Sequence, residues 1–203
     1  MKALYAAPLA WSLVGGMMAF AQDLPSAFRV TGVAADDVLN IRAAPSATAA
    51  VIGMIGPDGE AVEVIALSPD GRWGKVGLPE GNGWVAMRFL DAMPVTEAHL
   101  IPRPLTCLGT EPFWSIRLLP EGADYASPDN GTVALSLTEE AVGREGFFFR
   151  VNEGPTLIRS VIVRREWCSD GMSDREFGFS ALMFSEAPDG NSVLAGCCTL
   201  DNR

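Results

Sequence analysis

Short apolar runs separated by polar turns make up most of this chain. Runs rich in β-branched and aromatic residues occupy positions 62–65, 83–86, 133–137, 147–151 and 161–163. Turn-forming sequences, such as Gly-Asn-Gly at 81–83 and Asp-Asn-Gly at 129–131, separate them. No stretch after residue 22 sustains a 3.6-residue apolar repeat with helix caps. The pattern therefore predicts an all-β protein with few, short helices.

The start of the chain has a different pattern. Residues 3–18 are almost entirely apolar, follow Lys2, and lead into Ala-Phe-Ala at 19–21. This arrangement is typical of a secretory signal peptide that is cleaved after Ala21. An uncleaved membrane anchor is the alternative, because the run approaches the roughly 20 residues that span a bilayer. The small residues at the cleavage positions favour cleavage, which predicts an exported, periplasmic protein with no stable membrane insertion.

The rest of the chain is longer than a typical domain of about 100 to 150 residues. Prolines cluster at positions 94–104, around His99, the single histidine of the sequence. Prolines interrupt regular structure, so this cluster is the best candidate for a boundary. We predict one small β domain at 22–93, a proline-containing linker at 94–104 and a second all-β domain at 105–203.

Charge and cysteine content narrow the possible partners. The formal net charge is −10 at pH 7, which disfavours nucleic acid and leaves basic proteins and cationic ligands possible. Cysteines occur at Cys107, Cys168, Cys197 and Cys198, and an even number in an exported chain predicts two disulfides. A bridge between the adjacent Cys197 and Cys198 would be strained. On a strand their sulfurs point to opposite faces, so each needs a different partner, and two pairings stay open.

The inventory of reactive residues disfavours catalysis. With one histidine and with its cysteines expected to be in disulfides, the chain lacks the parts for Ser-His or Cys-His chemistry. It has no nucleotide-binding fingerprint and no zinc-protease motif. We therefore expect a protein that is not an enzyme and has no cofactor or metal.

Spaced motifs cover the first predicted domain. They are Leu-Asn-Ile-Arg at 39–42, Pro45, Val-Ile-Gly at 51–53, Trp-Gly-Lys-Val at 73–76 and Gly-Trp-Val at 83–85. Residues 27–92 thereby resemble a bacterial SH3-like (SH3b) domain, which implies a small closed barrel. Leu39 and Ile41 would face the core of that barrel, leaving Arg42 free to form hydrogen bonds.

The resemblance implies a binding module for a cell-wall peptide or glycan (peptidoglycan) or for an envelope protein. Trp73, Trp84 and Arg42 are the candidate ligand-binding residues of this module. The alternative is that both tryptophans pack in the core or at its rim, since tryptophan is usually largely buried.

The second predicted domain carries three further motifs. They are Glu-Pro-Phe-Trp at 111–114, Cys-Ser-Asp-Gly-Met-Ser-Asp at 168–174 and Gly-Cys-Cys at 196–198. Residues 105–203 thereby resemble a family of bacterial envelope proteins and lipoproteins, and they depart from it at Phe-Gly-Phe 177–179, where tyrosine and proline are usual. The resemblance implies no activity. It does imply a Cys168–Cys197 bridge and hence Cys107–Cys198, in a disulfide-stapled antiparallel β barrel or sandwich.

These motifs suggest a second candidate site. Glu111, Trp114, Asp170 and Asp174 could bind a cation, a sugar hydroxyl or a basic side chain, with Trp114 as a stacking platform. The alternative is structural: Asp170 and Ser173 satisfy turn backbone groups, Glu111 pairs with an arginine such as Arg175 or Arg165, and Trp114 is core. The spacing does not match a calcium loop.

Taken together, the sequence favours an exported, non-enzymatic envelope protein. Its SH3b-like domain would bind a cell-wall peptide or glycan or a protein ligand, beside a β domain of unknown partner. The alternative is an acidic periplasmic inhibitor or adaptor that acts on a basic wall-degrading enzyme such as lysozyme. A structural partner in an envelope complex is a third interpretation.

Overall fold

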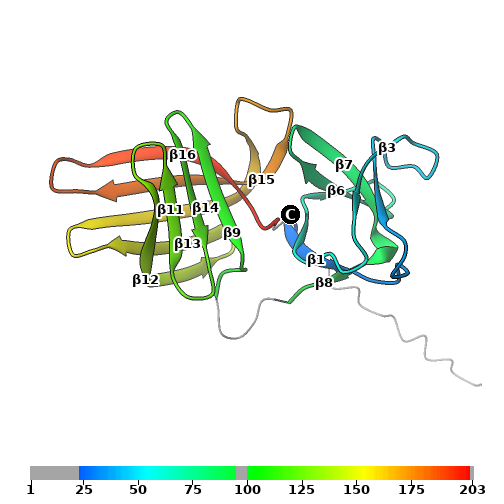
Figure 1. Ribbon diagram of the computed structural model, residues 1–203, viewed down its shortest axis with the longest axis horizontal. Helices are drawn as coiled ribbons and strands as arrows, with labels where there is room; N and C mark the ends of the chain where they lie inside the picture. Colours follow the sequence, from blue (N-terminus) through cyan, green and yellow to red (C-terminus); the bar gives the residue numbers. More distant parts are fainter. Residues whose placement is uncertain (1–22, 95–99, 202–203) are drawn as a thin grey trace, which may run out of the picture.

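The computed structural model describes residues 23–94 and 100–201. Over these ranges the protein is all-β, apart from the short 3-10 helix η1 at Met87–Phe89, which confirms the predicted fold class. Two β bodies lie side by side in Figure 1. The predicted signal peptide and His99 lie outside the described residues.

The first body is built from two small sheets. One has the order β4-β1-β8 and the other the order β3-β2-β7-β6-β5. Their strands are β1 Ser26–Val30, β2 Leu39–Arg42, β3 Val51–Ile55, β4 Val62–Val64, β5 Ala66–Leu67, β6 Trp73–Leu78, β7 Gly81–Ala86 and β8 Leu90–Ala92. Leu39 and Ile41 are buried between the sheets, as the alternation along β2 predicts.

The second body is a closed barrel of antiparallel strands. Its strands are β9 Leu105–Thr110, β10 Phe113–Leu118, β11 Ala123–Ser127, β12 Gly131–Gly143, β13 Gly146–Glu153, β14 Leu157–Ser169, β15 Glu176–Glu186 and β16 Ser192–Thr199. Each strand pairs with the next in sequence, and β16 pairs with β9 to close the barrel. Inward apolar side chains such as Ile116, Phe149 and Phe179 fill the interior. Closure decides between the two predicted architectures in favour of the barrel and leaves no unpaired strand edge.

The described part of the predicted linker packs against the barrel. Ile101 is fully buried in the barrel core. The Arg103 guanidinium donates to the Ile101 and Leu119 carbonyls and pairs with Glu140 at 2.6 Å. Residues 100–104 are therefore anchored by apolar burial and by a mostly buried ion pair.

Two disulfides tie the last strand to the rest of the barrel. Cys198 faces inward and bonds to Cys107 of β9, while Cys197 faces the other side and bonds to Cys168 at the end of β14. This is the pairing that the family resemblance implies. Opposite sulfur directions at adjacent positions follow from the two-residue period of a strand.

Hydrogen bonds connect the two bodies through the β6–β7 hairpin. Asn82 donates from Nδ2 to the Glu176 carbonyl at 3.1 Å, and its Oδ1 accepts from the Glu176 N–H at 2.7 Å. Lys75 Nζ lies 3.0 Å from Glu176 Oε2. The Arg175 side chain lies directly over Gly77, where a Cβ atom would come within 2.7 Å of the guanidinium. The start of β15 is thus fixed against the first body.

A buried carboxylate makes a second connection. Glu63 of β4 is 1% exposed and accepts from the Thr199 hydroxyl at 2.7 Å and from the Leu200 N–H at 2.9 Å. Burial raises the pKa of Glu63 to about 7, although both hydrogen bonds lower it. The C-terminal end of the barrel therefore contacts a titratable group of the first body.

Candidate functional site

The outer face of the first body carries an indole between two cations. Trp84 of β7 is paired in register with Arg42 of β2 on one side and with Lys75 of β6 on the other. Lys75 Nζ lies 5.5 Å from the centre of the Trp84 ring, and Arg42 Nη1 donates to the Ala49 carbonyl at 2.7 Å. All three side chains are partly exposed. Such a row can stack on a ligand and hydrogen-bond to its acceptors.

Trp73 lies next to this row. It is half-buried on the same face of β6 as Lys75, and its backbone N–H donates to the Ser68 hydroxyl at 3.0 Å. The adjoining turn is fixed by Asp70, which accepts from the Ser68 hydroxyl and from the Arg72 N–H. These hydrogen bonds hold the pKa of Asp70 well below its usual range. Trp73 is therefore positioned by a rigid turn beside the Arg42–Trp84–Lys75 row.

In the second body, Asp170 organises the loop between β14 and β15. Its Oδ1 accepts from the Met172 and Ser173 N–H groups at 3.0 and 2.9 Å, and its Oδ2 accepts from the Ser173 hydroxyl at 3.0 Å. The Thr110 hydroxyl donates to the Asp170 carbonyl at 2.9 Å. Slight burial raises the pKa of Asp170, but the hydrogen bonds from Ser173 and Met172 outweigh this effect. The pKa is therefore below its ordinary value, and the carboxyl stays ionised at neutral pH. These contacts match the structural interpretation of Asp170 and Ser173.

Trp114 lies inside the barrel. It is 4% exposed, and its indole lies against Gly109 of β9 and Gly196 of β16. A Cβ atom at Gly109 would come within 2.1 Å of the indole nitrogen, so the ring fits only because that position has no side chain. The indole N–H is buried and meets no acceptor among the described residues. Trp114 is therefore a core residue of the barrel and not an exposed stacking platform.

A pocket of about 560 Å³ lies where the two bodies meet. The first body contributes Pro79 and Glu80 from the β6–β7 turn, and the second contributes Phe113, Asp170 and Met172 among other residues. Trp114 and Ser173 also belong to the lining. Two of the four predicted residues of the second site, Trp114 and Asp170, thus lie around one pocket that includes part of the other domain.

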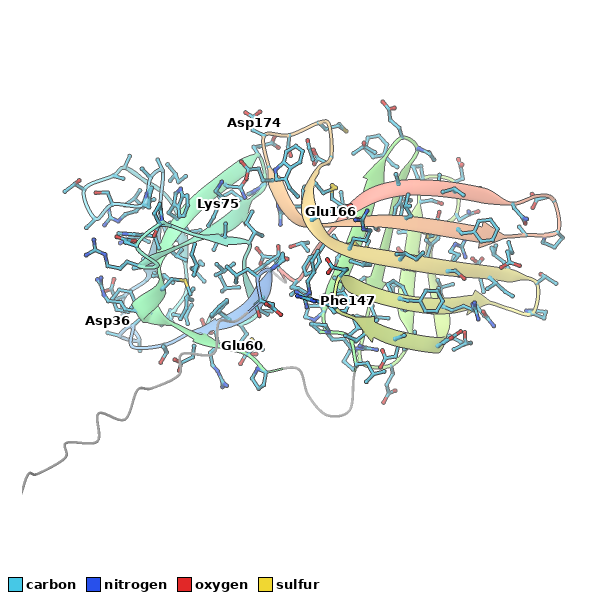
Figure 2. All side chains as sticks on the ribbon, turned by 180° about the vertical axis from the view of Figure 1, so that it is seen from behind. Asp36, Glu60, Lys75, Phe147, Glu166 and Asp174 are labelled. Atoms are coloured by element: carbon cyan, nitrogen blue, oxygen red, sulfur yellow. A yellow bond between two sulfur atoms is a disulfide. The ribbon has the colours of Figure 1, made fainter. Side chains whose placement is uncertain are left out.

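The other two predicted residues lie elsewhere. Glu111 is exposed at the β9–β10 turn and lines a separate groove of about 610 Å³ on the outside of the barrel, which Asp170 also borders. No ion pair joins it to Arg165 or Arg175 in the structure. Asp174 is exposed on the β14–β15 loop, above the level of Lys75 in Figure 2, and lines neither pocket. The four residues therefore do not form one compact cluster.

Glu80 and Phe113 are among the pocket residues that sequence reasoning missed. Glu80 lies in a turn of the first domain, and nothing in the local sequence indicates which part of the second domain it approaches. Phe113 could have been found, because the alternation of β10 that turns Trp114 inward turns Phe113 outward, where it is 53% exposed.

Other chemistry is not apparent in the part of the chain that the structure covers. Within residues 23–94 and 100–201 there is no group of three or more His, Cys, Asp or Glu side chains that could hold a metal ion. Over the same ranges, no helix is long and apolar enough to cross a membrane. All four cysteines are in disulfides.

Comparison with known proteins identifies the first body. Residues 37–91 match the bacterial SH3 domain family, so this segment is a bacterial SH3 domain, and the match begins just before β2 and ends within β8. No curated protein and no solved structure matched the chain. A domain of this family suggests a cell-wall-binding module, and together with two disulfides it fits an exported protein.

Proposed function

With residues 37–91 as a bacterial SH3 domain, we propose that this is an exported, non-enzymatic envelope protein that binds a peptide or glycan of the cell wall. The ligand contacts the outer face of the SH3 domain, at Arg42, Trp84 and Trp73. The observation that carries the proposal is the Arg42–Trp84–Lys75 row within the segment that matches the family.

The chemistry of this row suits a wall peptide. The Arg42 guanidinium, anchored by one bond to the Ala49 carbonyl, keeps other donors for carboxylate or carbonyl oxygens of a ligand. The Trp84 ring offers an apolar surface for a sugar ring or an alkyl side chain. Lys75 also forms an ion pair with Glu176 of the barrel, so strand β6 contributes both to the proposed ligand-binding face and to the domain interface.

The test is co-sedimentation of the protein with purified peptidoglycan sacculi. Trp84→Ala should weaken binding by about tenfold, as expected when a central aromatic contact is removed. Phe184→Ala is the matched control, because Phe184 is an aromatic residue of β15 in the barrel, 37% exposed and outside the SH3 domain. Equal retention of the two variants would contradict the assignment of the face, and no retention of the unaltered protein would contradict wall binding.

The same assay separates the alternative function. An acidic inhibitor or adaptor should bind lysozyme, and this binding should weaken as salt is raised because it depends on charge. Lysozyme binding without sacculus binding would replace the wall-binding proposal with the inhibitor.

A further inference from the structure

The pocket at the domain junction has a lining that neither domain provides alone. Pro79 and Glu80 come from the SH3 domain, and Phe113, Asp170 and Met172 come from the barrel and its β14–β15 loop. Its volume of about 560 Å³ is in the range of binding sites for small ligands or for one to two side chains. Such a site exists only while the two domains keep this arrangement.

Hydrogen bonds on both sides of the pocket fix its walls. Asn82, two residues after Glu80, makes the two hydrogen bonds to the Glu176 backbone that join the domains. On the barrel side, the β14–β15 loop is closed by Asp170 and attached to β9 by the bond from Thr110. The opposing walls are therefore set in the free protein, which lowers the entropic cost of binding.

The charge of the lining selects the kind of ligand. Among the described residues, the lining includes the carboxylates of Glu80 and Asp170 and no lysine, arginine or histidine. Glu80 is exposed and makes no hydrogen bond or ion pair with any described residue. Asp170 Oδ2 accepts only from Ser173, which leaves room for a further donor. An anionic ligand would be repelled, whereas a cationic one would find the unpaired carboxylate of Glu80 on one side and the remaining acceptor capacity of Asp170 on the other.

The apolar part of the lining fits an alkyl chain. The ring of Phe113 is 53% exposed and the side chain of Met172 is 68% exposed, and both are in the pocket wall. A thioether adapts to the shape of a ligand, and an aromatic face attracts a cation. Together with the carboxylates, they match a side chain that has an apolar stem and a cationic end.

A peptide is the class of ligand that fits this lining. Trp114 and Ser127 belong to the lining, but the Trp114 nitrogen and the Ser127 hydroxyl oxygen are covered and have no partner among the described residues. The Trp114 nitrogen faces Gly109, so the ligand contacts are expected at the two carboxylates, Phe113 and Met172. A peptide brings carbonyl groups and a basic side chain at once, whereas a neutral sugar brings no cation for Glu80.

From these observations we propose that the junction pocket binds a basic segment of a protein partner, with a lysine or arginine side chain between Glu80 and Asp170 over Phe113 and Met172. This site is separate from the wall-binding face at Trp84. Its occupant is distinguished from wall glycan by its charge.

The experiment is an NMR titration of the disulfide-bonded protein with the blocked peptide acetyl-Gly-Lys-Gly-amide. We expect shifts of the Trp114 indole N–H and of the backbone amides of Glu80 and Gly171, with a dissociation constant of about 1 to 10 mM for so small a probe. The same peptide with norleucine in place of lysine should bind at least about threefold more weakly, because it keeps the alkyl stem but has no charge.

Two variants and a control test the assignment. Glu80→Gln should weaken binding of the lysine peptide about two- to fivefold, the usual range for an exposed charge pair. Phe113→Ala should also weaken it, and because this side chain lies outside the barrel core the variant should fold normally. Glu121→Gln, a change of the same charge at an exposed residue outside the pocket lining, should leave binding unchanged. Binding of Glu80→Gln to sacculi should be unaffected, which separates this site from the proposed wall-binding face.

Several results would overturn the proposal. Equal affinity for the lysine and norleucine peptides would show that the charge of the ligand has no role. An equal loss of affinity in Glu80→Gln and Glu121→Gln would show that only the net charge of the protein matters, and not the position of Glu80. Absence of shifts around the pocket at about 10 mM peptide would refute binding at this site. Shifts at the same residues with chitotriose, and none with the lysine peptide, would assign the pocket to a glycan.

Discussion

The two domains are stabilised in different ways, although both are built from antiparallel strands. The SH3 domain encloses a small core of residues such as Ile41, Val64 and Val85 and has no disulfide. The barrel has a larger aromatic core and two disulfides that join its last strand to β9 and to β14. The two domains also contact each other, because Glu63 and Asn82 of the first are hydrogen-bonded to backbone groups of the second. The covalent cross-links and the larger aromatic core thus belong to the barrel, whereas the proposed wall-binding face belongs to the SH3 domain.

The largest expected effect is loss of the disulfide between Cys107 and Cys198. It closes a sequence separation of 91 residues, against 29 for Cys168–Cys197. By the loop-entropy relation, the longer loop contributes about 4 to 5 kcal/mol and the shorter about 3 to 4 kcal/mol. The double variant Cys107→Ala/Cys198→Ala should therefore unfold at lower denaturant than Cys168→Ala/Cys197→Ala, measured by tryptophan fluorescence. The reverse order would show that native packing, and not loop length, sets the difference.

The next effect concerns Glu63 and pH. Its pKa is raised from 4.5 to about 7 in the folded protein, so folded molecules retain a proton that unfolded ones lose over this pH window. The stabilisation by protonated Glu63 is fully present below pH 4.5 and is lost as the pH rises to about 7. The free energy of unfolding decreases by about 3 kcal/mol over this range. Glu63→Gln should have a flatter profile of unfolding free energy against pH than the unaltered protein.

The control for this pH effect is Glu60→Gln, a change at an exposed residue three positions before Glu63. Its pH profile should follow that of the unaltered protein. If Glu63→Gln retained the full decrease between pH 4.5 and 7, the pH dependence would have to come from another group.

A smaller effect is expected where Trp114 meets the glycines. Gly109→Ala would place a Cβ atom within 2.1 Å of the indole nitrogen, and overpacking of this kind costs about 1 to 3 kcal/mol. Chemical denaturation of this variant should show a lower midpoint with an unchanged slope. Gly71→Ala is not a suitable control because of its positive φ, but Gly81→Ala is, since its Cβ atom would meet open space.

The weakest expected effect is at the ion pair between the domains. Lys75 and Glu176 are 22% and 42% exposed, so their 3.0 Å contact should contribute only about 0.2 to 1 kcal/mol. Lys75→Met should shift the thermal midpoint slightly, and the shift should shrink at high salt because ions screen the pair. A large, salt-independent loss would show that Lys75 acts through its contact with Trp84 instead.

Local sequence patterns predicted most of the fold. Alternation placed Leu39 and Ile41 in the core, and the two-residue period of a strand separated the sulfurs of Cys197 and Cys198. The predicted runs at 133–137 and 161–163 cover only part of β12 and β14, which are 13 residues long each, because the rest of each strand mixes polar and apolar residues and is paired with neighbouring strands.

The candidate sites were harder to predict because they depend on contacts between distant segments. Glu63 lies between two valines on a strand of three residues, and its burial comes from Thr199 and Leu200, more than 130 positions away. Glu80 joins the junction pocket only because the domains dock at Asn82 and Glu176. The docking of the domains cannot be predicted from any periodic pattern in the sequence. The positions of Arg42 and Trp84, in contrast, follow from motifs within one domain.

Wall recognition by the SH3 domain is tested most directly by NMR mapping of the protein with soluble peptidoglycan fragments. We predict the largest shift changes at the Trp84 indole N–H and at the amides of Arg42 and Trp73, with the barrel amides unaffected. Shifts confined to the barrel, or no shifts with fragments at millimolar concentration, would contradict wall recognition through this face.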